Sequence, residues 1–414
     1  MRILRYVLFF ILFIFLQSHS ATYEIKSTHS KSDLKSSIIN SKPHDTIIVH
    51  EGIYHETNIE VMHPLTIRGQ GKAVIDGQGK DQIFKITSDS VTIENLTING
   101  SGVSYIKDNA AILVEESKFC TVQNNILNDN FFAIYLSKSS NCIVKGNEIT
   151  GNAISESSSG NGIHAWYCKN IEIYDNKVSN HRDGIYFEFV KNSQIKNNLS
   201  SGNLRYGLHF MFSDSCTYKM NTFKNNGAGV AVMYSKYVDM IENRFILNQG
   251  SSSYGLLLKE ISDSKIINNS FKNNTVAIYI EASNRIQVDG NDIVENGWAM
   301  KVMSNSLDNF ITRNNFISNS FQISTNGRNN NSTFSENYWS DYSGYDLDRD
   351  GYGDVPFRPV SLFAIEVEKR PQSIILLHSI FVNIISTVEK IIPTITPETL
   401  IDDKPAMDII YDNN

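Results

Sequence analysis

A histidine and two methionines stand out among the side chains that could do chemistry. His209 and Met211 lie in YGLHFMF, residues 206–212, and Met233 lies in GVAVMYS, residues 229–235. Both segments alternate apolar residues with others, which is the pattern of a strand with one buried face. An imidazole and two thioethers suit soft Cu(I) well and suit Zn²⁺, Ca²⁺ or Mg²⁺ poorly. The three side chains are therefore a candidate copper site if the fold brings them together.

An internal repeat predicts that it does. Nine segments share a small first residue followed by an apolar, any and an apolar residue, mostly 22 residues apart, and they start at Ala111, Ala133, Gly162, Gly184, Gly207, Gly229, Gly255, Ala277 and Ala299. An asparagine ladder keeps the same phase at Asn124, Asn147, Asn176, Asn197, Asn221, Asn243, Asn269, Asn291, Asn314 and Asn337. This period, with short strands and turn residues, predicts an all-β fold, a right-handed parallel β-helix in which each rung stacks on the last.

The repeat assigns side chains to faces. Residues one and three after each first residue are apolar and face inward, so those two and four after it point outward. Met211 and Met233 then lie on adjacent rungs about 4.8 Å apart, and His209 lies about 6.5 Å along the strand from Met211. The alternative is that these are surface residues covered by a cap, a loop or a partner protein.

Three other residues share the outward columns near this trio. They are His164, Glu188 and Met303. We expect them to act as alternative copper ligands or as partners that orient the ligands. Met303 lies three rungs from Met233, which argues against its belonging to the same site.

The ends of the chain differ from the repeat. Residues 1–21 have a basic start, a short apolar core and small residues at the end, which indicates a cleaved secretory signal peptide and a periplasmic or extracellular protein. We expect the β-helix over 22–340, with rungs from about Thr46 and a cap before them. Residues 341–360 then form an acidic capping loop and 361–414 a helical tail.

The acidic loop contains DLDRDGYGD. It places Asp346, Asp348, Asp350 and Asp354 near Gly351 with a spacing that resembles the start of an EF-hand loop. Carboxylates at alternate positions predict a Ca²⁺ site, although the terminal Glu of an EF-hand is absent. The alternative is a solvated acidic turn.

The tail has helical periodicity from about Gln372 to Ile392 and stops at Pro393. Polar residues interrupt it too often for a membrane span. It should pack on the β-helix end, or else dock on a membrane partner.

Cysteines and composition limit other functions. Cys120 and Cys142 fall on adjacent rungs, where a disulfide and buried free thiols are equally consistent, and Cys168 is a weak metal candidate near His164. The chain has 41% hydrophobic and 20% charged residues and a net charge of −7, with no basic run. It is therefore globular, and nucleic acid is not expected as a partner.

Two rival functions remain open. Many right-handed β-helices are polysaccharide lyases, hydrolases or epimerases, and such chemistry needs an acid and a base on the outer face. The outward positions four residues after each repeat's first residue offer Glu115, Glu188, Lys259 and Glu281, but these are dispersed over several rungs. The other rival is a structural adaptor without metal.

Several motifs resemble the NosD family, a β-helical periplasmic maturation factor of nitrous oxide reductase in denitrification. They are RYGLHFMFS, GAGVAVMYS, YGLLLKEI, NYWSDYSGYDLDRDGYGDVPFRPV and IIPTITPETLIDDKPAM, in the family's order over nearly the whole mature chain. His209, Met211 and Met233 lie within them, although their copper role is inferred from geometry.

The resemblance implies a copper-handling protein that is not an enzyme. It would be membrane-associated through partners, docked on an ABC transporter of the NosF and NosY type. It would receive Cu(I) from a NosL-type chaperone and help load apo nitrous oxide reductase, and the family has also been linked to sulfur supply.

Overall fold

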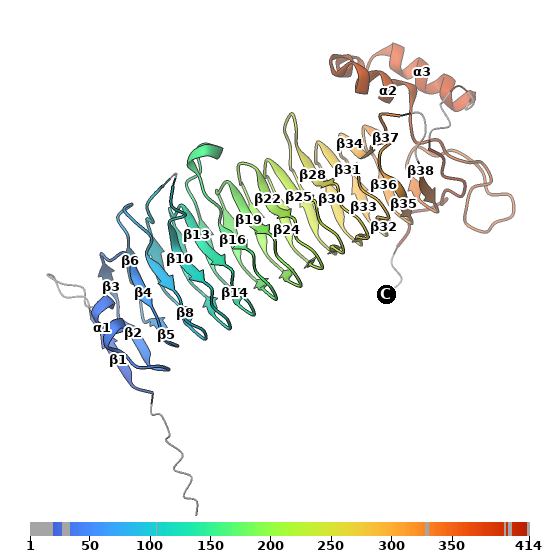
Figure 1. Ribbon diagram of the computed structural model, residues 1–414. Coiled ribbons are helices and arrows are strands. Elements are labelled where there is room, and N and C mark those ends of the chain that lie inside the picture. The colour runs from blue at the N-terminus through green and yellow to red at the C-terminus, as the bar shows by residue number, and fades with distance from the viewer. Residues whose placement is uncertain are drawn as a thin grey trace, which may run out of the picture.

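The chain winds into a long parallel β-helix, as the repeat predicts (Figure 1). The computed structural model describes residues 20–26, 34–104, 106–327, 331–392, 395 and 400–411. Within these ranges three sheets of 14, 12 and 13 strands run along the solenoid, and every strand pair is parallel. The expected right-handed β-helix is confirmed. The predicted signal peptide lies almost wholly outside the described residues and stays a prediction.

The first sheet runs in chain order through β1 (Thr22–Ile25), β2 (Thr46–Val49), β5 (Thr66–Gly69), β8 (Thr92–Glu94), β11 (Thr121–Gln123), β14 (Ile143–Lys145), β17 (Glu172–Tyr174), β20 (Gln194–Lys196), β23 (Thr217–Lys219), β26 (Asp239–Ile241), β29 (Lys265–Ile267), β32 (Gln287–Asp289), β35 (Leu307–Thr312) and β38 (Asn331–Ser335).

The second sheet, which carries the repeat's first residues, runs through β4 (Ile59–Val61), β7 (Phe84–Ile86), β10 (Ala110–Glu115), β13 (Phe132–Ser137), β16 (Ile163–Trp166), β19 (Asp183–Glu188), β22 (Tyr206–Met211), β25 (Ala228–Met233), β28 (Tyr254–Lys259), β31 (Val276–Glu281), β34 (Trp298–Val302) and β37 (Phe321–Ser324).

The third sheet runs through β3 (Gly52–Tyr54), β6 (Ala73–Asp76), β9 (Thr97–Asn99), β12 (Ile126–Asn128), β15 (Glu148–Thr150), β18 (Lys177–Ser179), β21 (Leu199–Ser201), β24 (Thr222–Lys224), β27 (Arg244–Ile246), β30 (Ser270–Lys272), β33 (Asp292–Val294), β36 (Asn315–Ile317) and β39 (Tyr338–Trp339).

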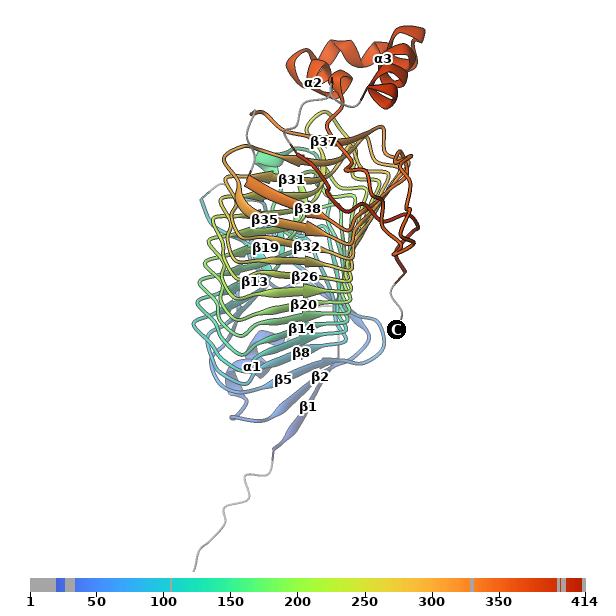
Figure 2. The ribbon, with the colours of Figure 1, turned by 90° about the vertical axis from the view of Figure 1, so that its right-hand side faces the viewer.

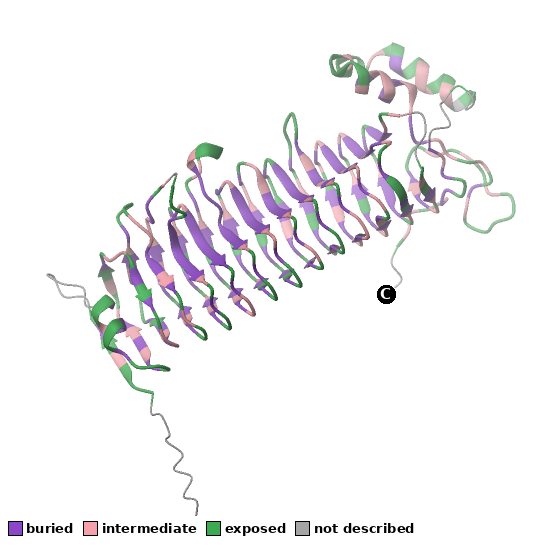
Figure 3. Cartoon of the chain, viewed as in Figure 1, coloured by how far each residue is buried: buried purple, intermediate pink, exposed green. Residues whose placement is uncertain are grey.

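One continuous apolar core fills the solenoid, and the purple strands of Figure 3 trace it from end to end. Leu208 and Phe210 of β22 are fully buried in it, as the alternation predicts, and so is Met240. Phe245 and Phe271 stack on adjacent rungs with ring centroids 4.4 Å apart. The interior therefore fixes the register of each rung against the next, because a slip would expose these side chains.

Buried asparagines tie the rungs together at a turn. Asn221, for example, donates from Nδ2 to the carbonyls of Ile195 and Lys219 and to Oδ1 of Asn243. These bonds satisfy turn backbone that water cannot reach. Eight of the ten asparagines expected in the ladder occupy these buried positions.

Two members of the expected ladder are wrong by one residue. Asn125 and Asn198 occupy the buried positions, bonding to Asn147 and Asn221 respectively. Asn124 and Asn197 precede them with φ near 54°. That left-handed conformation, which Asn tolerates better than most residues, turns their side chains out of the ladder.

Both ends are capped. Helix α1 (Leu34–Asn40) buries Leu34 and Ile38 over the first rungs, and β1 pairs with β2, so the first sheet begins well before the expected Thr46. At the other end residues 400–411 return to the solenoid, and Asp402 accepts hydrogen bonds from Asn337 and Trp339. Asp402 thus takes the next place in the ladder. Residues 400–411 were expected to be part of a helical tail, but they form no helix.

The tail helices lie on the outer face of the second sheet near its end (Figure 2). They are α2 (Leu362–Lys369), the 3₁₀ turn η2 (Pro371–Leu376) and α3 (Ile380–Ile391). Phe363 of α2 packs with Phe321, and Lys301 pairs with Glu368 at 2.6 Å. The single helix expected from Gln372 to Ile392 is divided into η2 and α3. A new helix starts after Ser379, whose side chain accepts a hydrogen bond from the N–H of Val382.

The helices are too short for a membrane span, and the cysteines form no disulfide in the described part of the chain. Within the described ranges no helix has the length and apolar character needed to cross a bilayer. All four cysteines are buried free thiols. Burial raises the pKa of Cys168 to about 11 and that of Cys216 to about 12, so both are protonated thiols at neutral pH.

Candidate metal centre

Met211 and Met233 lie side by side on the outer face of the second sheet. They are register partners on β22 and β25, near the middle of the solenoid (Figure 1). Adjacent parallel strands place their Cα atoms about 4.8 Å apart. Both residues are half-buried. The sequence prediction that these two residues stack is confirmed.

His209 points to the same face but is nearly enclosed. Only 5% of the residue is exposed. Its ring stacks on Tyr186 at 4.5 Å and packs against Tyr206 at 4.8 Å. Neither ring nitrogen has a hydrogen-bond partner in the part of the chain that the structure describes. A buried imidazole with two unsatisfied nitrogens is costly unless a ligand or proton partner completes it.

A buried ion pair flanks that ring. Asp183 is fully buried, and its Oδ2 lies 3.6 Å from Nδ1 of His209, beyond hydrogen-bond length. Arg205 donates from Nε to Oδ1 at 2.9 Å and from its terminal nitrogen to Oδ2 at 2.5 Å. Burial alone raises the pKa of Asp183, but His209 and Arg205 outweigh it and lower the pKa to about 2. Asp183 is therefore a carboxylate at neutral pH.

Glu188 stands beside Met211 in register on β19. Partial burial raises the pKa of its carboxyl, against a lowering by His209 and by a hydrogen bond from Tyr186. The hydroxyl of Tyr186 also lies 3.5 Å from the sulfur of Met211. Glu188 is therefore the expected site residue that lies next to Met211, and its role there stays a prediction.

The other two expected residues lie apart from the trio. His164 is separated from His209 by the Tyr186 rung and is sandwiched between Tyr135 and Tyr186 at 4.7 and 4.8 Å. Burial lowers the pKa of His164 to about 3, so it is neutral. Met303 follows β34, three rungs beyond Met233, and is buried. The structure brings neither residue into the site.

The sequence analysis missed Asp183, Arg205 and Tyr206. Asp183 and Tyr206 each precede the small first residue of a repeat, and alternation assigns that position to the interior. In the structure the two residues are register partners at a corner of the rung and flank the outer face. A charged residue directly before a repeat Gly, in an otherwise inward column, was the available signal. The rule failed because regular alternation ends where the strand bends into the turn.

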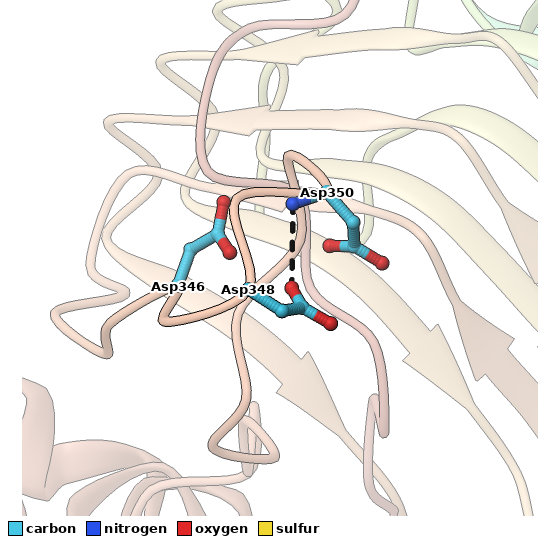
Figure 4. Close-up of side chains that lie close together, drawn as sticks. All are labelled: Asp346, Asp348 and Asp350. Atoms are coloured by element: carbon cyan, nitrogen blue, oxygen red, sulfur yellow. Dashed lines mark hydrogen bonds between the residues drawn. The ribbon is translucent and has the colours of Figure 1, made fainter.

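The acidic loop forms a second cluster. Asp346, Asp348 and Asp350 lie close together on one loop (Figure 4), and each offers an oxygen within 4.8 Å of the others. A backbone hydrogen bond from Asp350 lowers the pKa of Asp348, but the charges and carboxyls around it outweigh this and raise it. Asp354 is not part of this cluster, and its Oδ2 accepts a hydrogen bond from the N–H of Leu347 at 2.7 Å. Three of the four expected Ca²⁺ ligands are brought together.

The trio of His209, Met211 and Met233 offers nitrogen and sulfur donors. Met211 and Met233 are half-buried, and neither buried ring nitrogen of His209 has a hydrogen-bond partner among the described residues, although Nδ1 faces Asp183. Such a set matches Cu(I), whereas the three aspartates match a hard oxygen-seeking cation. The register of β22 and β25 fixes the backbone positions of the three residues.

Comparisons with known proteins agree with this chemistry. The family model described as "Periplasmic copper-binding protein (NosD)" matches residues 38–155 and 147–344. A relative from Pseudomonas aeruginosa, named probable ABC transporter binding protein NosD, is 28% identical over 84% of this chain and 85% of its own length. One of the same name from Stutzerimonas stutzeri is 25% identical over 85% of each.

Solved structures share the fold. The catalytic unit of a GH87 α-1,3-glucanase from Streptomyces thermodiastaticus gives a TM-score of 0.59 at 11% identity, over 78% of this chain and 69% of its own. A family 28 exopolygalacturonase from Yersinia enterocolitica gives 0.50 at 10% identity, over 77% and 78%. At such low identity these likenesses support the β-helix alone.

Proposed function

The chain belongs to the NosD family of periplasmic copper-binding proteins, and from this premise we propose that it carries Cu(I) on His209, Met211 and Met233. The observation that supports this most is the register pairing of the two methionines beside a buried imidazole with unsatisfied nitrogens. Soft donors hold Cu(I), and partial exposure of the thioethers lets a partner reach it. Glu188 supports the site from the neighbouring rung.

We further propose the direction of transfer. The metal would come from a NosL-type chaperone and go to apo nitrous oxide reductase while the chain is docked on an ABC transporter of the NosF and NosY type. The curated relatives are named as ABC transporter binding proteins, which favours such a partner. Docking would use the apolar side of α3, where Ile380 is 79% exposed and Ile384 and Ile391 are also exposed.

The role we propose is not enzymatic. Of the carboxylates available for polysaccharide chemistry, Glu115 pairs with Lys85 at 2.9 Å and Glu281 lies 4.0 Å from Lys259. Glu188 is separated from Glu281 in its column by Met211, Met233 and Lys259. An acid and base pair on one rung is therefore missing from these candidates. Depolymerisation or epimerisation of alginate or pectate by the purified protein would contradict this proposal.

Anaerobic titration of the purified mature protein with Cu(I), against a competing chelator, tests copper binding. We expect tight binding of one ion by the wild type and its loss in His209→Gln/Met211→Leu/Met233→Leu. Met240→Leu is the matched control, since Met240 is buried in the core. Undiminished binding by the triple variant, with an unchanged circular dichroism spectrum, would overturn the site.

We also propose that Asp346, Asp348 and Asp350 hold Ca²⁺ in the capping loop. The loop backbone is already ordered around these carboxylates, because Asp346 accepts hydrogen bonds from the N–H groups of Arg349 and Gly351. A bound cation would relieve the crowding of negative charge there. Its role would be structural, since the loop lies at the end of the solenoid (Figure 1).

A further inference from the structure

Asp183 is a buried charge that the copper ligands alone do not explain. Its side chain is 0% exposed, and it lies on β19 opposite Tyr206 of β22. A carboxylate taken out of water costs several kcal/mol unless it is paired and hydrogen-bonded. A neutral residue would cost less at this corner, and Ala228 occupies the same position two rungs further on. Its position beside His209 suggests a role in the site.

Arg205 and the backbone fix the direction of this carboxylate. The guanidinium binds both oxygens, and the N–H of Tyr206 donates to Oδ1 at 3.3 Å. Arg205 also lies over the ring of Tyr206, 5.0 Å from its centroid. A two-point contact of this kind sets the plane of the carboxylate as well as its distance. Oδ2 is thereby held toward the imidazole.

The imidazole is equally constrained. Tyr186 stacks on one side of His209 and Tyr206 packs against it from another direction, so the ring has little freedom to turn. Nδ1 is the nitrogen 3.6 Å from Oδ2 of Asp183. A proton on Nδ1 faces a negative charge favourably, whereas a lone pair there would be repelled.

We propose that Asp183, held by Arg205, is a positioning residue that keeps the proton of His209 on Nδ1 and leaves Nε2 bare for copper. The inference rests on the proposed function for the metal, but the tautomer does not depend on it. Metal-binding histidines commonly use such a carboxylate, which raises the basicity of the ligating nitrogen. On binding, the gap at Nδ1 would close to a hydrogen bond.

The first test needs no metal and no variant of Asp183. Two-bond ¹⁵N–¹H spectra of ¹⁵N-histidine-labelled protein at mildly alkaline pH report which nitrogen carries the proton. The His209 signals are those that disappear in His209→Gln. We expect the Nδ1–H tautomer, and a predominant Nε2–H tautomer would overturn the proposal.

The second test uses Asp183→Asn, which keeps the shape and removes the charge. We expect a Cu(I) dissociation constant about 10- to 100-fold higher than that of the wild type, with the His209 tautomer shifted toward Nε2–H. Asp263→Asn is the matched control, because Arg285 binds Asp263 through the same two nitrogens across adjacent rungs on an exposed turn. It should change neither readout.

The outcomes separate the two proposals. If the wild type binds Cu(I) and Asp183→Asn binds it as tightly, the positioning role is wrong and the copper site stands. If His209→Gln binds as tightly as the wild type, the copper site itself is wrong. If Asp183→Asn does not fold, the tautomer of the wild-type protein still decides whether Asp183 acts as proposed.

Discussion

Met211 and Met233 are register partners on adjacent rungs. Their side chains therefore start from the same sheet face, one strand spacing apart. A parallel solenoid repeats each position by translation, and equal positions in consecutive repeats therefore become neighbours. A pair of methionines 22 residues apart in sequence thus becomes one two-point site. Five expected outcomes follow from this arrangement and from the rest of the fold.

Removing one thioether should weaken copper binding and leave the fold intact. We expect Met233→Leu to raise the Cu(I) dissociation constant at least about tenfold, which is roughly 1.4 kcal/mol. The swap conserves volume at a half-buried position, so the free energy of unfolding should change by less than about 1.5 kcal/mol. Chelator competition and thermal unfolding measure the two effects. An equal loss of affinity in the core variant Met240→Leu would show that the effect is not local.

The apolar side of α3 should be needed for docking on the transporter. We expect Ile380→Asp/Ile384→Asp to lose co-purification with the membrane transporter subunit, because a charge in an apolar contact is costly to desolvate. Asn383→Asp adds one negative charge at an exposed polar position of α3 and should co-purify normally. Cu(I) affinity should be equal in all three proteins. Retained co-purification by the double variant would place the docking surface elsewhere.

Calcium should stabilise the capping loop. We expect millimolar Ca²⁺ to raise the melting temperature of the wild type but not that of Asp346→Asn/Asp348→Asn, since two of three ligands lose their charge. Asp129→Asn, on a turn of the solenoid, serves as the control and should respond like the wild type. A Ca²⁺ effect that survives in the double variant would exclude this site.

Acid should destabilise the fold partly through His181. Burial lowers its pKa to about 4, slightly offset by a hydrogen bond with the Gly160 backbone, against about 6.5 when unfolded. Between these values the unfolded chain binds a proton that the folded chain does not. Stability is therefore fully present above pH 6.5 and falls by about 3 kcal/mol as the pH drops to 4.

The variant His181→Leu tests this assignment through denaturant unfolding at several pH values. We expect its stability to fall less between neutral and acidic pH than that of the wild type. Parallel slopes for His181→Leu and the wild type would contradict the role of His181.

Breaking one ladder asparagine should be severe. Asn221 donates three hydrogen bonds, and its Oδ1 accepts two from Asn198. Asn221→Ala would strand several buried groups, at a cost of at least about 3 kcal/mol. We expect a clear fall in melting temperature, whereas Asn152→Ala, at an exposed loop position, should be within about 0.5 kcal/mol of the wild type. Similar melting temperatures would show that water replaces the ladder bonds.

Much of the fold was accessible from sequence because solenoid contacts follow a local rule. The inward positions of Leu208, Phe210 and Met240 were predicted from alternation, and so was the stacking of Met211 on Met233. The two misplaced asparagines mark the limit of that rule. Whether Asn124 or Asn125 turns inward depends on one left-handed residue, which composition does not specify.

The sequence by itself determined the period of the repeat, the faces of its strands and hence the pairing of the two methionines. Only the tertiary structure decided that His209 is enclosed by tyrosines and faces Asp183, since corner residues escape the alternation that orders the strands. It also decided that the tail lies along the second sheet and that Asp402 closes the ladder. The contacts of the tail and of Asp402 join residues far apart in sequence. Each contact occurs once, so the repeat pattern does not predict it.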